Sequence, residues 1–259
     1  DSIYEARYVS GIVAGMKLKA LMDEGKVTDP YVGYVGAYPY AEVVSGYTAF
    51  FLGVRSVCKE ATMEVQFTGS WYDEAKEKEA ATLLIGRGCK LISQHADSMG
   101  APTACESAGV PNVSYNGSTL DACPNTFIVS SRINWVPYMK YMIECVRDNK
   151  AIDTDWCKGI NEGAVELTPI NEKVAAPGTA EAIKAAEEQF KAGTLHVFDT
   201  STFTVDGKTL TSYMADVDTD EKFTPDTEVI SNGYFHESEK RSAPYFDVNI
   251  DGITLLNEG

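Results

Sequence analysis

Aromatic, amide and acidic side chains recur in this sequence wherever a short β-rich run ends. They occupy five segments: Tyr38–Glu42, Ser70–Asp73, His95–Ser98, Asn116–Ser118 and Arg132–Trp135. Flat rings stack on a planar heterocycle or a sugar face, while carboxylates and amides hydrogen-bond to its polar edges. We therefore predict a site for a flat polar solute. Stacking is expected from Tyr38, Trp71 and Trp135, and edge hydrogen bonds from Asp97, Asn116 and Asn134.

Each of these residues also has a plain structural explanation when it is taken alone. Tyr38 or Trp135 can pack in a core, and Asp73 can cap a helix. The coincidence at five strand ends is what favours binding, because ligands of parallel sheets lie outside the carboxyl ends of the strands.

The five segments meet only if the runs before them are parallel strands of one sheet. The β-rich runs are Tyr31–Gly36, Thr62–Thr68, Cys89–Gln94, Asn112–Tyr115 and Phe127–Ser130. The stretches between them predict helices at about Glu42–Val57, Asp73–Ile85 and Ala101–Ala108, after a first helix over residues 3–22. Strands that alternate with crossover helices predict an α/β fold, with a parallel sheet and flanking helices.

The second half of the chain has a looser pattern. Helices are predicted at Val136–Arg147 and Thr179–Lys191, with an extended segment at Gly159–Pro169. Phe203–Leu210 has Asp206-Gly207 at its centre and predicts a hairpin. Residues 211–259 are polar and weakly periodic, so no further element is predicted there.

Composition excludes several classes of protein. The 259 residues are 44% apolar and 23% charged, which is enough for a packed core and argues against disorder. The 22 basic and 38 acidic residues give a net charge of −16, so nucleic acid and anionic lipid are poor partners. No apolar run is long enough for a membrane span, and we expect no targeting segment within this sequence, which opens at Asp1.

Metal and cofactor motifs are missing from the sequence. The six cysteines form no CxxC pair, and the three histidines form no HExxH motif. We expect buried thiols, with one or two disulfides as the alternative in an exported protein. No metal ion and no cofactor is predicted.

Catalytic motifs are incomplete. Ala96–Gly100 lacks the first glycine of a G-x-S-x-G nucleophile elbow, although it follows a strand and precedes a helix. Gly207-Lys208-Thr209 resembles the end of a Walker A loop, but Thr202 replaces the first glycine. We therefore predict no enzyme activity, and a serine hydrolase centred on Ser98 stays as the alternative.

Five blocks of the sequence resemble the basic membrane protein family over roughly residues 1–195. They are Glu5–Gly15, Gly33–Val43, Ser70–Glu79, Gln94–Ser98 and Asn134–Tyr138. The resemblance implies a substrate-binding lipoprotein of an ABC importer that binds a purine nucleoside or nucleobase between two α/β lobes. It further implies an extracytoplasmic location, an ABC permease as partner and a lipid anchor outside this chain.

The resemblance also suggests how the chain is divided. Residues 1–28 would be a linker helix and remnant of the first lobe, 29–133 the core of the second lobe, 134–199 helices that return toward the first lobe, and 200–259 a tail with a hairpin. Most of the first lobe is missing from this layout.

Individual residues follow the family pattern in part. Asp97 matches a polar strand-end position of the adenine-type branch, and Asn134-Trp135 matches an Asn-Trp-Gly-Pro-like segment in which Val136 replaces the glycine. Asn116 stands where the nucleoside branch has an aspartate, and Arg132–Ile133 where it has a lysine nearby. A ligand sensor or protein-interaction module of the same fold, using the acidic tail for a partner, is a further alternative.

Overall fold

The centre of the protein is a seven-stranded sheet with the strand order β11-β2-β1-β3-β4-β5-β6. The computed structural model describes residues 1–218, 220 and 222–258. Five strands lie where they are predicted: β1 (Tyr31–Gly36), β2 (Thr62–Phe67), β3 (Leu91–His95), β4 (Asn112–Tyr115) and β5 (Phe127–Ile133). All four pairings among them are parallel, so their carboxyl ends share one edge, and the α/β fold is confirmed.

The two edge strands extend the sheet beyond the prediction. β6 (Val165–Leu167), within the segment expected to be extended, pairs antiparallel with Ser131–Ile133. This pairing is why β5 continues past Ser130. At the other edge, β11 (Ile253–Leu255) pairs in parallel with β2, although the sequence pattern indicated no element in this region.

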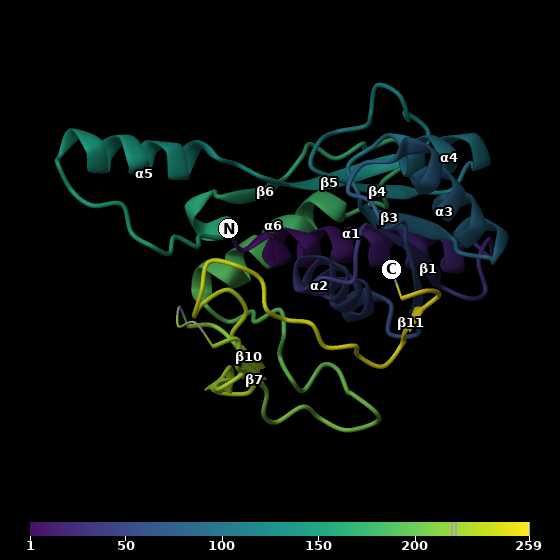
Figure 1. Ribbon diagram of the computed structural model, residues 1–259. Helices are drawn as coiled ribbons and strands as arrows, with labels where there is room; N and C mark the ends of the chain where they lie inside the picture. The colour runs from purple at the N-terminus through teal and green to yellow at the C-terminus, as the bar shows by residue number, and fades with distance from the viewer. Residues whose placement is uncertain (219, 221, 259) are drawn as a thin grey trace.

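Helices cover both faces of the sheet (Figure 1). On one face lie α1 (Ile3–Asp23), α2 (Ala41–Val57) and α6 (Thr179–Ala192), and on the other α3 (Glu74–Gly86) and α4 (Gly100–Ala108). Asp73 caps α3 as predicted, since its carboxylate accepts a hydrogen bond of 3.0 Å from the Lys76 N–H. None of the helices in the described part of the chain is long and apolar enough to cross a membrane.

The contact between α1 and α2 is unusually close. A Cβ built on Gly11 would lie 2.0 Å from the Phe50 carbonyl oxygen, and one built on Gly53 would lie 2.0 Å from the Tyr8 carbonyl oxygen. Only glycine allows the two backbones to approach this far. The two glycines therefore fix the distance between the helices.

Helix α5 (Val136–Arg147) projects away from the sheet, at the left of Figure 1. Its one buried residue is Cys145. On one side, Tyr138 and Tyr141 contact the ring of Trp156, with centroids 5.1 and 6.1 Å away. The other side carries exposed apolar residues at helical spacing, Val136, Met139, Ile143 and Val146.

The C-terminal segment packs against the α1 and α2 face rather than forming a separate tail (Figure 1, green to yellow). Its buried rings include Phe203, Phe235 and Phe246, and Phe246 stacks on Phe198 at 4.3 Å. Two pairs of short strands lie here: β7 (Met214–Ala215) with β8 (Thr227–Glu228), and β9 (Ile230–Ser231) with β10 (Tyr234–Phe235).

The hairpin predicted at Phe203–Leu210 is wrong except for its turn. Asp206 and Gly207 have φ of 51° and 74°, as a tight turn requires, but the flanks form a single bridge between Val205 and Lys208. The Thr204 carbonyl instead accepts the Asp251 N–H at 2.9 Å. All six cysteines are free thiols, and five are buried, as the main interpretation of the sequence expected.

We predict that Gly53→Ala lowers the free energy of unfolding by about 1–3 kcal/mol, because the added methyl group overlaps the α1 backbone. Urea unfolding measures the change. Gly86→Ala is the matched control: its Cβ would meet nothing within 4 Å, and the helix position favours alanine. Equal stability of the native chain and Gly53→Ala would show that the helices separate at no cost.

Candidate ligand-binding site

Three aromatic rings gather at the carboxyl edge of the sheet, and we call them the rim aromatics: Tyr38, Tyr40 and Trp71. Tyr38 follows β1 and stacks on Tyr40 with ring centroids 5.1 Å apart, while Trp71, which follows β2, meets Tyr38 edge-on at 5.5 Å. Tyr40 is 57% exposed and Trp71 36%. The rings therefore form an open apolar surface that a flat molecule can cover.

A hydrogen-bonded carboxylate and amide lie beside the rim aromatics. Asn116 Nδ2 donates to Asp97 Oδ1 at 2.7 Å, and the Asp97 N–H donates to the Trp71 carbonyl at 2.9 Å. Asn116 has a φ of 66°, a left-handed conformation that asparagine tolerates better than most residues. Partial burial raises the pKa of Asp97, while the hydrogen bond from Asn116 acts in the opposite direction. Four of the six predicted site residues are thus brought together.

The other two predicted residues, Asn134 and Trp135, are engaged elsewhere. Asn134 donates to the Gly163 carbonyl at 2.9 Å and accepts from the Val136 N–H at 3.2 Å, so its amide holds the start of α5. Trp135 is 53% exposed and meets Tyr138 edge-on at 6.4 Å. Among the described residues, no hydrogen bond or ring pairing joins Asn134 or Trp135 to the rim aromatics or to Asp97, and their role in binding stays a prediction.

A buried cation, Arg7, lies beneath the rim aromatics. It was not among the site residues predicted from the sequence. Arg7 of α1 is fully buried, and its Nη2 donates to the Gln94 carbonyl at 2.7 Å. Its guanidinium carbon lies 4.1 Å from the centre of the Tyr115 ring and 5.7 Å from that of Tyr34. In the sequence, Arg7 falls on the apolar side of the first helix together with Ile3 and Ala14. A charged residue at such a position indicates a buried cation.

His95 ends β3 next to this cation. Its ring lies 4.6 Å from that of Tyr115, and its Nε2 is 3.8 Å from a Glu42 carboxylate oxygen. Burial, and secondly the charge of Arg7, lower the pKa of His95 to about 4, so the imidazole is neutral at physiological pH. A Cβ on Gly46 would lie 2.6 Å from His95 Nδ1, so that glycine leaves room for the ring.

The hydrolase alternative centred on Ser98 finds no support. Ser98 is 4% exposed, its Oγ accepts the Gly100 N–H at 3.0 Å, and its own N–H donates to the Glu77 carboxylate. In the described chain, both nitrogens of the neighbouring His95 are without a hydrogen-bond partner, so His95 does not activate Ser98. Ser98 holds the loop before α4.

A mostly parallel sheet flanked by helices is also the fold of two solved ABC solute-binding proteins. A solute-binding protein of Conexibacter woesei superimposes with a TM-score of 0.59 and 22% identity, over 75% of this chain and 62% of its own. One from Aeropyrum pernix gives a TM-score of 0.64 and 14% identity, over 75% and 64%. These likenesses establish the fold.

The chain belongs to the PnrA-like family of ABC transporter substrate-binding proteins, Bmp, whose family model matches residues 2–196. The resemblance to this family inferred from the sequence is thereby confirmed. A purine-binding protein of Brucella abortus is 30% identical over 189 residues, 71% of this chain and 51% of that protein. A protein of Haloferax volcanii named as a candidate glucose-binding protein is 31% identical over 202 residues, 78% and 49%. The chain spans about half the length of these relatives.

We predict that His95 makes stability depend on pH. The folded protein keeps the pKa of His95 at about 4, whereas the unfolded chain titrates near 6.5 and binds more protons between these values. The contribution of His95 to stability therefore declines as the pH is lowered from 6.5 to 4. His95→Gln removes up to about 3 kcal/mol of this decline, measured by urea unfolding at several pH values.

The exposed residue His196 provides the control, since His196→Gln leaves the decline between pH 6.5 and 4 in place. An unchanged decline in His95→Gln would contradict a neutral, buried imidazole at this position.

Proposed function

We propose that this chain is part of an extracytoplasmic solute-binding protein that captures a purine nucleoside or nucleobase and passes it, unaltered, to an ABC permease. The observation that carries the proposal is the pairing of the rim aromatics with the Asp97–Asn116 hydrogen bond at one edge of the sheet. The name of the Brucella relative, a purine-binding protein, supports the same ligand class.

The chemistry of the rim suits a purine. A ring system of this kind presents two flat faces for stacking, and N–H and ring nitrogen groups around its edge. The Asp97 carboxylate accepts hydrogen bonds from ring or amino N–H groups, and the Asn116 amide both donates and accepts. When a ligand binds, its polar groups can replace the hydrogen bond between Asp97 and Asn116. Each of the two side chains then keeps a hydrogen-bond partner.

A sugar is the second candidate ligand. Aromatic faces also stack on pyranose rings, and the relative in Haloferax volcanii is named for glucose. Under either proposal, one sheet edge covers part of a ligand, so binding by this chain alone is weak. We propose that a lipid anchor outside the described chain tethers the protein beside its permease, as the family resemblance implies.

We predict that Trp71→Ala weakens purine binding by about 1–3 kcal/mol, a stacking contribution, and that Asp97→Ala weakens it by about 1.5–3 kcal/mol. Titration calorimetry with adenine, adenosine, guanosine, inosine and glucose measures both changes and ranks the ligands. Tyr72→Ala is the matched control, because Tyr72 is next to Trp71 in sequence but 67% exposed.

If glucose is the only one of the five compounds that gives heat of binding, the ligand is a sugar and not a purine. Absence of heat with all five compounds, or binding that survives both Trp71→Ala and Asp97→Ala, would remove the rim as the site.

A further inference from the structure

Three polar side chains of the C-terminal segment form a hydrogen-bonded chain on the surface. The Oγ of Ser231 lies 2.7 Å from Nε2 of His236, and Nδ1 of His236 lies 2.7 Å from Oε2 of Glu239. All three residues lie outside residues 2–196, the part that the family model matches. The order hydroxyl, imidazole, carboxylate is the arrangement that activates a serine nucleophile.

The carboxylate fixes the tautomer of the histidine. An ionised Glu239 only accepts hydrogen bonds, so Nδ1 of His236 carries the proton and Nε2 is left with a free lone pair. That lone pair accepts the hydroxyl proton of Ser231. Once Nε2 is protonated, the Ser231 carbonyl oxygen, 3.2 Å away, is a second acceptor for it.

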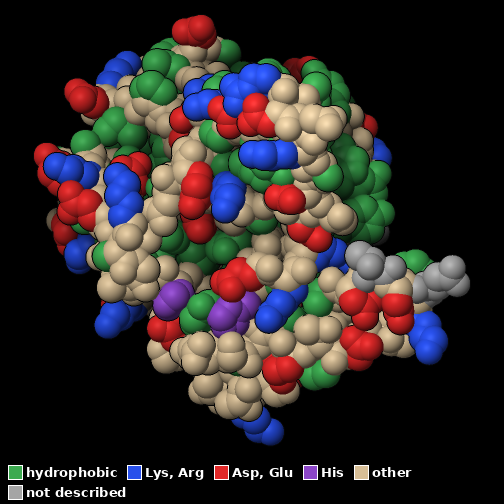
Figure 2. Space-filling view, turned by 90° about the vertical axis from the view of Figure 1, so that its left-hand side faces the viewer, with side chains coloured by type: hydrophobic (Ala, Val, Ile, Leu, Met, Phe, Trp, Pro, Cys, Tyr) green, Lys and Arg blue, Asp and Glu red, His purple; other side chains and the backbone are tan. Residues whose placement is uncertain are grey.

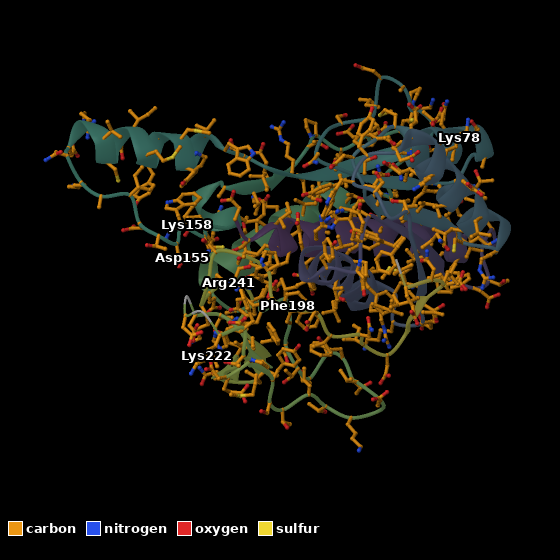
Figure 3. All side chains as sticks on the ribbon, in the orientation of Figure 1. Lys78, Asp155, Lys158, Phe198, Lys222 and Arg241 are labelled. Carbon is orange, nitrogen blue, oxygen red and sulfur yellow. The ribbon has the colours of Figure 1, made fainter. Side chains whose placement is uncertain are left out.

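The hairpin β9–β10 and its neighbours hold the three residues in place. The Phe235 N–H donates to the Phe198 carbonyl at 3.0 Å, and the His236 N–H donates to the Val229 carbonyl at 2.9 Å. The buried hydroxyl of Tyr245 donates to the His236 carbonyl and accepts the Glu239 N–H at 3.2 Å. Phe198, labelled in Figure 3, belongs to the packed aromatic core beneath the hairpin.

A ring stack fixes the imidazole from the side. The Tyr234 ring lies 3.9 Å from the His236 ring and 3.8 Å from the His196 ring, so it is enclosed between two histidines. Figure 2 shows histidine side chains near one another on one face of the molecule. Ser231 is exposed. The hydroxyl is therefore accessible while its base is restrained.

The turn after the serine offers hydrogen-bond donors for a developing negative charge. Asn232 and Gly233 have φ of 52° and 87°. Within the described residues, neither backbone N–H donates a hydrogen bond to another backbone or side-chain atom. The N–H that follows a nucleophilic serine is the one that commonly stabilises the oxyanion of acyl transfer.

We propose that Ser231, His236 and Glu239 form an esterase site that hydrolyses small, uncharged carboxylic esters. Ser231 Oγ attacks the ester carbonyl as its proton moves to His236 Nε2, and the carbon–oxygen bond to the leaving alcohol breaks as that alcohol takes the proton. Water then gives a proton to Nε2 and attacks the acyl-serine, which releases the carboxylic acid and returns the proton to Oγ.

The surrounding charge selects among esters. The carboxylate of Glu239 is 49% exposed, Glu228 is exposed beside the β9 strand, and the net charge of the chain is −16. Anionic esters are repelled from such a surface. Neutral acetyl esters are therefore the expected substrates.

The test uses the whole chain and p-nitrophenyl acetate as probe. We expect a steady release of p-nitrophenol that Ser231→Ala reduces about 100–10,000-fold, the contribution typical of a positioned general base. Mass spectrometry after an acid quench should find the acetyl group on Ser231. A fluorophosphonate should label Ser231 with loss of fluoride and block turnover, and the anionic p-nitrophenyl succinate should react more slowly than the acetate.

Two variants separate activation from ordinary surface chemistry. Ser107→Ala, at an exposed serine on α4, keeps the native rate. Glu239 acts as a positioning residue, so Glu239→Gln lowers kcat with KM unchanged and Glu239→Asp restores part of kcat. A native rate in Ser231→Ala, acylation at His236 or a lysine instead of Ser231, or no turnover at all would overturn the proposal. None of these assays depends on ligand binding at the rim.

Discussion

The contact between α1 and α2 through Gly11 and Gly53 determines how the ligand edge is built. Arg7 on α1 and Glu42 on α2 approach His95 from the two helices, so the helix separation sets how closely their charges lie beneath the rim. A wider crossing would admit water around Arg7 and weaken its field on Asp97 and His95. The electrostatics of the rim thus depend on a backbone contact about one helical turn along α1 from Arg7.

Arg7 is buried with little to neutralise it. Its cation faces two aromatic rings and one backbone carbonyl, and Glu42 and Asp97 are the carboxylates whose pKa its charge lowers. Such a group favours negative charge or acceptor atoms at the rim. Burial raises the pKa of Asp97, and the hydrogen bond from Asn116 and, to a smaller extent, the charge of Arg7 oppose that rise.

The central fold can be predicted from the sequence because the patterns that indicate its strands and helices are local. Strand ends followed by Trp71, Asp97 and Asn116 were visible as residue types after β-rich runs, and parallel pairing places such ends at one edge. Asn134 was predicted to join them by the same rule, but its amide holds α5 because β5 is lengthened by β6. That lengthening depends on a partner strand more than thirty residues later.

Other features depend on contacts that no local pattern encodes. β11 is three residues long and becomes a strand by pairing with β2, almost two hundred residues earlier. The aromatic residues of the C-terminal segment follow no regular spacing in the sequence, yet in the structure they share one core with Phe198. Likewise, Ser231, His236 and Glu239 are ordinary surface residues in the sequence, and their geometry appears only when the Asn232-Gly233 turn sets the register of the hairpin.

The projecting helix α5 has a consequence for how the protein behaves in solution. Four aliphatic and thioether side chains on one side of a helix attract their counterparts on other molecules, while sixteen excess negative charges keep those molecules apart. Added salt shortens the range of the repulsion and leaves the attraction intact. Self-association of this chain therefore increases as the ionic strength is raised.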